Sequence, residues 1–218
     1  MTQSPNSDQL SIEITSDFVC PWCYIGEARL EKAIKLAAPK VAIKRSWRPY
    51  ELNPDQPKGG VDRQEYMERR FGAEKMKAME ARMKELGKED GLEFHQELIK
   101  RSPNTRQAHR LNWLAEKEGK SLANRIFKAY FSEGKDIGDD EVLTELAEEA
   151  GMDTKKVRAF LSSNEGVNDI ERMEEQGRAR GIQGVPFITI DSEEIRGAEL
   201  VEEMRAALER ALKSRKAA

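Results

Sequence analysis

The chain begins with segments in which hydrophobic and polar residues alternate. Residues 10–15 (LSIEIT) and 41–47 (VAIKRSW) change character at every second position, which predicts two strands. Between them, apolar residues from Cys20 onward recur every three or four positions, and Pro39 ends this pattern, which predicts a helix. This part of the chain therefore predicts a strand, a helix and a second strand.

The C-terminal part carries another alternating segment, followed by a helical one. Residues 186–190 (PFITI) and 194–196 predict two short strands joined by a turn at Asp191 and Ser192. An amphipathic helix is predicted over residues 199–212. The basic run 213–216 is interpreted as a solvated tail. This part therefore predicts a hairpin and a closing helix.

The long region between these two parts has the periodicity of helices. Residues 49–60 are rich in proline and glycine and break regular structure before it. Its best-defined helices are predicted over residues 105–118, 122–131 and 139–150. Asp139 is a predicted N-cap and Gly151 a predicted stop, and Asp153 is predicted to cap a further short helix.

A narrow apolar stripe marks one more helix in this region. It consists of Met76, Met79, Met83 and Leu86, on a segment that is otherwise rich in lysine and glutamate. Methionine repacks easily, so the stripe could cover a partner protein. Its width is that of a seam between neighbouring helices, and we interpret it as such a seam.

The order of these elements predicts an α/β fold. A βαβ half at the N-terminal end and a ββα half at the C-terminal end together make up a thioredoxin-like fold, and a large all-helical insertion lies between them. We assign residues 9–58 to the N-terminal half of that fold, 59–181 to the insertion and 182–213 to the C-terminal half.

Composition narrows the classes of function. The chain has 218 residues, of which 35% are charged, and its formal net charge is -3. Lysine and arginine are balanced by acids, which disfavours a nucleic-acid binder. The first ten residues, MTQSPNSDQL, lack the basic start and apolar run of a secretory signal, and no stretch resembles a membrane span. We therefore expect a cytoplasmic protein that binds neither nucleic acid nor membrane.

The two cysteines of the chain stand three positions apart at the start of the first predicted helix, in the segment Cys20-Pro21-Trp22-Cys23. The free N–H groups and the positive end of a helix favour a thiolate, so we expect Cys20 to be an exposed nucleophile. Cys23, one turn further on and partly covered, would resolve the mixed disulfide. Pro21 suits the first helical position, where its missing N–H costs nothing.

A zinc site is the structural alternative for these cysteines. Structural zinc takes four ligands, and the only other soft candidates are His95 and His109. These two histidines lack the close spacing of zinc ligands and lie in the predicted insertion. We therefore expect no metal, and we interpret the cysteine pair as a redox dithiol.

The chain resembles the DsbA-like thioredoxin family, and most closely its FrnE-type branch, which is related to 2-hydroxychromene-2-carboxylate isomerases. The resemblance spans nearly the whole chain. Its segments are residues 17–26 (DFVCPWCYIG), 48–54 (RPYELNP), 104–111 (NTRQAHRL) and 181–187 (GIQGVPF). The first and the last of these, which carry the CxxC motif and the Val185-Pro186 pair, are the specific ones.

The resemblance implies a dithiol at Cys20 and Cys23 beside a cis peptide bond at Pro186. Trp22, Pro21 and Val185 would then shape the contact with the substrate. Asn53 matches a loop that helps to hold glutathione in related transferases, and an ordinary Asx turn is the structural alternative there. His109 lies in a shared segment and would be a polar contact near the site, although a single helical histidine is more often a satisfied structural residue.

Three functions follow from these observations. The first is a thiol–disulfide oxidoreductase with no bound cofactor, acting on disulfide-containing proteins or low-molecular-weight thiols, with glutathione as a candidate redox partner. The second is a glutathione-dependent isomerase or transferase, although these relatives carry serine where this chain has Cys20. The third is a binding module that uses the insertion and needs no thiol. We expect the first.

Overall fold

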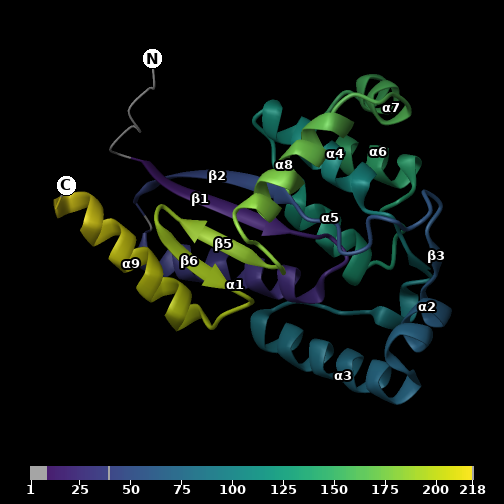
Figure 1. The fold of residues 1–218 in the computed structure, drawn as a ribbon, viewed down its shortest axis with the longest axis horizontal. Coiled ribbons are helices and arrows are strands. Elements are labelled where there is room, and N and C mark those ends of the chain that lie inside the picture. The colour runs from purple at the N-terminus through teal and green to yellow at the C-terminus, as the bar shows by residue number, and fades with distance from the viewer. Residues whose placement is uncertain (1–8, 39, 218) are drawn as a thin grey trace.

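A four-stranded sheet forms the centre of the molecule in a computed structural model, which describes residues 9–38 and 40–217 (Figure 1). Its strands are β1 (Gln9–Ser16), β2 (Ala42–Pro49), β5 (Phe187–Ile190) and β6 (Glu193–Arg196), in the order β2-β1-β5-β6. β1 runs parallel to β2 and antiparallel to β5, and β5 pairs antiparallel with β6. The strands predicted from alternation are all present.

The register of the sheet follows from the alternation in β1. Ile12 lies opposite Ile190, and Ile14 lies opposite Ile188, so apolar side chains meet across the β1–β5 pair. All four of these isoleucines are buried. A shift by one residue would move this apolar set to the other face of the sheet, which fixes the pairing.

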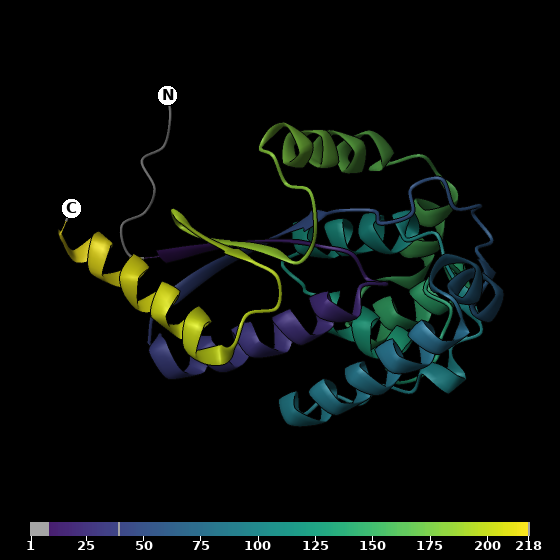
Figure 2. The ribbon, with the colours of Figure 1, turned by 60° about the horizontal axis from the view of Figure 1, so that its bottom comes forward.

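Helices cover both faces of this sheet. α1 (Pro21–Ala37) and α9 (Val201–Ala217) pack together on one side of it, and α8 (Val167–Ala179) lies on the other side against β2 (Figure 2). The order β1-α1-β2 and then β5-β6-α9 is that of a thioredoxin-like fold. The predicted fold class is confirmed.

The closing helix runs further than its apolar pattern indicates. α9 continues to Ala217, five residues past the predicted end, and takes in the basic run. Arg215 Nη2 lies 2.7 Å from Asp191 Oδ1 in the turn between β5 and β6. This ion pair holds the last turn of the helix against the hairpin, so the prediction of a solvated tail is wrong for Arg215.

The region between β2 and β5 is helical except for one short ladder. Its elements are β3 (Val61–Asp62), α2 (Arg63–Phe71), α3 (Ala73–Asp90), a 3-10 turn η1 (Gln96–Leu98), β4 (Arg101–Ser102), α4 (Arg106–Lys117), α5 (Ala123–Phe131), α6 (Asp140–Glu149), α7 (Thr154–Ser162) and α8. The β3–β4 ladder corrects the expectation of an all-helical insertion. Two-residue strands are too short to leave an alternation in the sequence.

The helices predicted in this region agree with the structure within one residue at each end. Asp139 accepts hydrogen bonds from the backbone N–H groups at the start of α6, and Asp153 does the same for α7. Gly151 follows α6 with a positive φ of 71°, which suits glycine. Both caps and the stop are confirmed. Among the described residues, no helix combines the length and the apolar character that crossing a bilayer requires.

An aromatic cluster joins the sheet unit to the inserted helices. Phe18, just before α1, lies 5.2 Å from Phe127 of α5 between ring centroids. Tyr24 of α1 stacks on Phe127 at 5.3 Å and on Phe131 at 5.7 Å. All of these side chains are buried. The start of α1 is therefore fixed by rings from both parts of the chain.

A glutamate of α4 with a raised pKa accepts a hydrogen bond from the edge strand β2. The backbone N–H of Trp47 donates a 3.0 Å hydrogen bond to Glu116 Oε1 of α4. Burial raises the pKa of Glu116 to about 7, although the Trp47 N–H, Arg48 and Arg45 oppose this shift. Glu116 is therefore protonated in the folded protein at pH values where it is ionised in the unfolded chain.

We expect this glutamate to make stability fall as pH rises from about 4.5 to about 7. In that window the folded protein holds one proton more than the unfolded chain, so raising the pH favours unfolding, by no more than about 1.4 kcal/mol per pH unit. Glu116→Gln keeps an acceptor for Trp47 but cannot ionise. Urea unfolding of both proteins across this range should show the wild type losing stability relative to the variant. Parallel pH curves would contradict the assignment.

Candidate active site

The two cysteines lie together at the start of α1. Cys20 is the N-cap, with φ -89° and ψ 112°, and Pro21 occupies the first helical turn. The backbone N–H groups of Cys23 and Tyr24 donate to the Cys20 carbonyl at 3.0 and 3.3 Å. This local geometry is the one expected for a proline just inside a helix start. It leaves the Cys20 side chain outside the first turn and Cys23 within it.

Both thiols are more buried than the sequence analysis expects. Cys20 is 5% exposed and Cys23 2%, whereas Trp22 between them is 42% exposed. One residue against Cys20 is Val185, whose carbonyl oxygen lies 3.8 Å from Cys20 Sγ. The expectation of an exposed Cys20 is therefore wrong for this structure. Val185 is far away in the sequence, so the helix pattern alone does not reveal this contact.

The segment that faces Cys20 contains the cis peptide bond that the resemblance implies. The Val185–Pro186 bond is cis, and the thiol of Cys20 donates to the Val185 carbonyl. Gly26, on the next turn of α1, allows this segment to approach. A Cβ on Gly26 would stand 3.1 Å from Pro186 Cγ, closer than a side chain normally tolerates. A glycine in α1 thus brings the proline segment against the dithiol.

The two sulfur atoms have different surroundings. Burial raises the pKa of the Cys23 thiol well above its usual range, and the neighbouring Cys20 raises it further. The Ser16 hydroxyl and the backbone N–H of Asp17 act in the opposite direction. Cys23 is therefore held protonated inside the protein, whereas Cys20 lies at the edge of the helix, facing Val185.

A buried acid precedes the dithiol by three residues. Asp17 Oδ1 is 3.2 Å from Nε2 of His109 on α4, and Asp17 Oδ2 accepts a 2.8 Å hydrogen bond from the backbone N–H of Leu52. The Asp17 side chain is 0% exposed and that of His109 1%. The Cys20 N–H also donates to the Asp17 carbonyl, at 3.1 Å. His109 is therefore joined to the site through Asp17.

Asp17 is the residue of this group that sequence reasoning missed. The chain carries it three residues before Cys20, between Ser16 and the apolar pair Phe18-Val19. An acid directly beside a buried apolar segment and the CxxC motif is the signal that could have pointed to it, because buried carboxylates need partners. The partner is 92 residues away in the sequence, so the pair itself becomes visible only in the fold.

A second buried carboxylate continues this polar layer. Glu51 Oε1 accepts a 2.8 Å hydrogen bond from Arg106 Nε, and the Glu51 backbone N–H donates to Glu174 of α8 at 2.7 Å. Burial raises the pKa of Glu51, whereas Arg106 and His109 oppose the shift. The loop after β2 is thus tied to α4 and α8, which fixes the loop that continues to Asn53.

Asn53 lines a cavity of about 170 Å³ that adjoins the CxxC segment at Pro21. Its Oδ1 accepts hydrogen bonds from the Tyr66 hydroxyl at 2.6 Å and from Arg70 Nη1 at 2.7 Å. Val19 and Pro21, the neighbours of Cys20 in the chain, line the same cavity. Asn53 therefore shares a cavity with the two sequence neighbours of Cys20, and His109 is joined through Asp17 to the segment that precedes Cys20.

Comparison with known proteins shows which family the chain matches. The model of the DsbA-like thioredoxin domain matches residues 11–209. The "Uncharacterized protein YwbO" of Bacillus subtilis (strain 168) is 28% identical over 191 residues, which cover 86% of this chain and 90% of that protein. The structure of a probable DsbA oxidoreductase from Streptomyces coelicolor is 30% identical, with a TM-score of 0.86, over 94% of this chain and 90% of that one.

More distant structures share the fold. A 2-hydroxychromene-2-carboxylate isomerase, at 16% identity, superimposes with a TM-score of 0.71 over 95% of this chain and 98% of the isomerase. The cytosolic disulfide reductase DsbM from Pseudomonas aeruginosa, solved with GSH, is 17% identical, with a TM-score of 0.64 over 94% of this chain and 100% of DsbM. The family match covers the dithiol, the cis-proline segment and the helices between them, and this chain belongs to the DsbA-like thioredoxin domain family.

Proposed function

We propose that the protein is a thiol–disulfide oxidoreductase that uses Cys20 as nucleophile and Cys23 as resolving thiol. The observation that carries the proposal is the unequal pair at the start of α1. Cys20 is the N-cap residue and its Sγ faces the Val185 carbonyl, whereas Cys23 lies within the first turn of the helix, where burial raises its pKa. An exchanging dithiol needs one attacking sulfur and a second one held in reserve.

The reaction proceeds in two exchanges. The thiolate of Cys20 attacks one sulfur of the substrate disulfide, which forms a mixed disulfide and releases the other sulfur as a thiolate. Cys23 then loses its proton and attacks Cys20 Sγ, which releases the second substrate thiol and leaves a Cys20–Cys23 disulfide. The substrate gains two electrons and the protein loses two. The reverse sequence oxidises a substrate dithiol.

The two parts of the chain have separate roles in this proposal. Residues 9–58 and 182–213 carry the dithiol and the cis-proline segment, and residues 59–181 shape access to them. Trp22, which is half-exposed, and Val185 would contact the substrate. Disulfide-containing proteins and low-molecular-weight thiols are the proposed substrates. Membership of the FrnE-type branch and a cytoplasmic location stay predictions.

Reduction of disulfides by the wild type and by Cys20→Ser tests the proposal. With dithiothreitol as electron donor, the wild type should accelerate insulin reduction, and the variant should fall to the uncatalysed rate because it has no attacking sulfur. Leu36→Ser, on the exposed far end of α1, is the control and should keep full activity. A serine variant that matched the wild type in this assay would overturn the proposal.

Glutathione chemistry is the second candidate, and two observations favour it. A cavity lies beside Cys20, and structures of a 2-hydroxychromene-2-carboxylate isomerase and of DsbM with GSH share the fold. In this candidate, Cys20 would position glutathione for an isomerisation or transfer. Under it, Cys20→Ser would retain or gain isomerase activity, whereas a wild type inert toward every disulfide would exclude the first proposal.

A further inference from the structure

The cavity next to the dithiol is lined largely by apolar side chains. Met79 and Met83 of α3, Phe71 of α2 and Phe131 of α5 line it, together with the residues on either side of Cys20. The methionine stripe therefore does more than pack neighbouring helices, because two of its members face this cavity. Its volume of about 170 Å³ exceeds the roughly 150 Å³ that is known to take up one benzene molecule.

One positive charge in the lining of this cavity lacks an acidic partner. The charged residues of the lining are Arg63, Arg70 and Glu80. Arg63 Nη2 forms an ion pair with Glu80 Oε1 at 2.7 Å, which cancels both charges. Arg70 contacts the uncharged Asn53 Oδ1 and Tyr66 hydroxyl, and its guanidinium lies over the rings of Tyr66 and Phe71. Within residues 9–38 and 40–217, no carboxylate pairs with Arg70.

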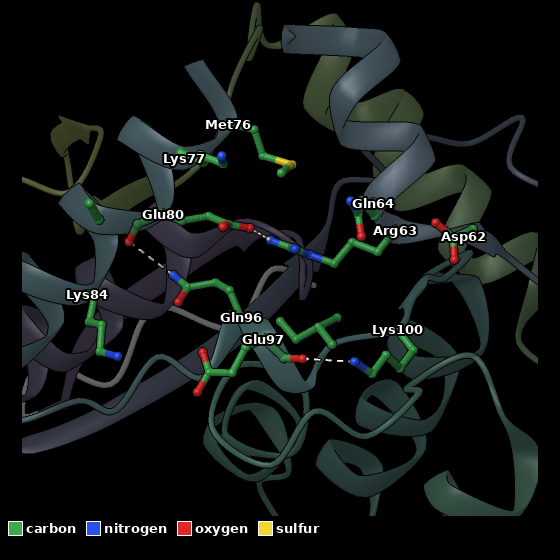
Figure 3. Close-up of a pocket in the computed structure, with 12 residues that line it drawn as sticks. Asp62, Arg63, Gln64, Met76, Lys77, Glu80, Lys84, Gln96, Glu97 and Lys100 are labelled. Carbon is green, nitrogen blue, oxygen red and sulfur yellow. Dashed lines mark hydrogen bonds and ion pairs between the residues drawn. The ribbon is translucent and has the colours of Figure 1, made fainter. Parts of the chain in front are cut away.

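Three polar residues line both this cavity and a second, larger one of about 470 Å³, the outer cavity, and thus form a partition between the two: Arg63, Glu80 and Gln96. Figure 3 shows Arg63 and Glu80 pointing toward each other there, and Gln96 toward Glu80. Lys77, Lys84 and Lys100 line only this outer cavity. Arg63 is therefore already paired with Glu80. Arg70 remains as the cation that can bind an anion in the cavity next to the dithiol.

We propose that this cavity selects disulfides in which one half carries a ring-sized apolar group and a carboxylate. The apolar group lies on Met79, Met83 and Phe131, and the carboxylate pairs with Arg70. The planar guanidinium suits a carboxylate, and Asn53 and Tyr66 hold it in place. This inference rests on the proposed dithiol function and names the substrate class of the same site.

The chemistry is the exchange already described. Cys20 attacks the sulfur that bears the bound half, and the other half leaves as a thiolate. Cys23 then displaces the bound half as a second thiolate. One disulfide is reduced to two thiols while the protein dithiol is oxidised to a disulfide, so atoms and electrons balance without a further reactant.

Small disulfides of different charge and shape test the proposal. The reduced protein is mixed with dithiobis(nitrobenzoate), which is aromatic and anionic, with dithiodipyridine, which is aromatic and neutral, and with glutathione disulfide, which is anionic without a ring. Each second-order rate constant is divided by the rate constant of free cysteine with the same reagent. The wild type should favour dithiobis(nitrobenzoate), and high salt should reduce this preference because it screens the charge of Arg70.

Variants on α2 separate recognition of the carboxylate from general damage. Arg70→Gln should lower the normalised rate with dithiobis(nitrobenzoate) about tenfold, which is the scale of one charge-assisted hydrogen bond. It should leave dithiodipyridine within about twofold, and Arg70→Lys should restore part of the loss. Arg69→Gln is the matched control. It removes the same charge from the next, exposed position, whose partner is Glu65, and should change neither rate.

The outcomes distinguish this inference from the function on which it rests. Equal loss with all three reagents in Arg70→Gln, or a wild type without preference, overturns the inference and leaves the dithiol function standing. Glutathione disulfide matching dithiobis(nitrobenzoate) in the wild type also overturns it, because the apolar group would then contribute nothing. A wild type that reacts with none of the disulfides overturns the proposed function itself. The wild-type ranking decides the question even if Arg70→Gln fails to fold.

Discussion

Replacing Cys23 with serine is expected to trap the protein in a covalent complex with its substrate. The first exchange needs only Cys20, whose Sγ lies at the edge of the site against Val185. The second exchange needs the sulfur of Cys23, which serine lacks. Multiple-turnover activity should fall to the background rate, while the mixed disulfide accumulates. Serine is close to cysteine in size, so the buried position should stay filled.

Intact-mass measurement under non-reducing conditions is the direct check. Cys23→Ser mixed with a small disulfide should gain the mass of one half of that disulfide and lose it again with dithiothreitol. Cys20→Ser should gain no such mass, because the remaining Cys23 is buried and its pKa is raised. If Cys23→Ser turns over like the wild type, Cys23 is not the resolving thiol. If Cys20→Ser forms the adduct, the two roles are reversed.

Replacing Asp17 with alanine is expected to cost about 2–5 kcal/mol of folding free energy, because it leaves two buried hydrogen-bond partners unsatisfied and each such group costs about 1–3 kcal/mol. The change removes the acceptor of the Leu52 N–H and the partner of His109 Nε2 at once. The Nδ1 atom of His109 is buried and has no hydrogen-bond partner among the described residues, so the imidazole would lose its one hydrogen bond and keep only its ring contact with Phe18. Chemical denaturation monitored by tryptophan fluorescence measures the loss.

Asp139→Ala provides a matched control for this prediction. It removes an aspartate that caps the exposed start of α6 and should cost about 1 kcal/mol. Asp17→Asn should fall between the two, because the amide keeps an acceptor for Leu52 but lacks the charge. If Asp17→Ala lowers the free energy of unfolding no more than Asp139→Ala does, the buried pair contributes little to stability, and the prediction is wrong.

Local patterns in the sequence are enough to predict most of the fold. Alternation in β1 and β2 and helical periodicity in α1 are properties of each segment by itself, so they predict these elements without knowledge of the tertiary contacts. The caps at Asp139 and Asp153 are local for the same reason. The cis geometry of the Val185–Pro186 bond was predicted from family resemblance alone, because the alternation of that strand does not distinguish cis from trans.

The site was predictable only in part, because much of it is made by contacts across the chain. Cys20 and Cys23 adjoin in sequence, so their pairing could be expected. Cys20 Sγ faces the carbonyl of Val185, 165 residues away, and the partner of Asp17 comes from α4. The cavity is made by α2, α3 and α5 together. Arg70 stands out only when the structure shows that no carboxylate reaches it among the described residues.

The aromatic cluster next to the dithiol limits how this chain can be shortened. Phe18 and Tyr24, on either side of the CxxC segment, rest on Phe127 and Phe131 of α5. Deleting the inserted helices would remove Phe127 and Phe131. Phe18 and Tyr24, on either side of the two cysteines, would then lose these packing partners and become exposed to solvent. The inserted helices thus complete the packing around the CxxC segment, and a redesign would have to keep or replace these rings together with that segment.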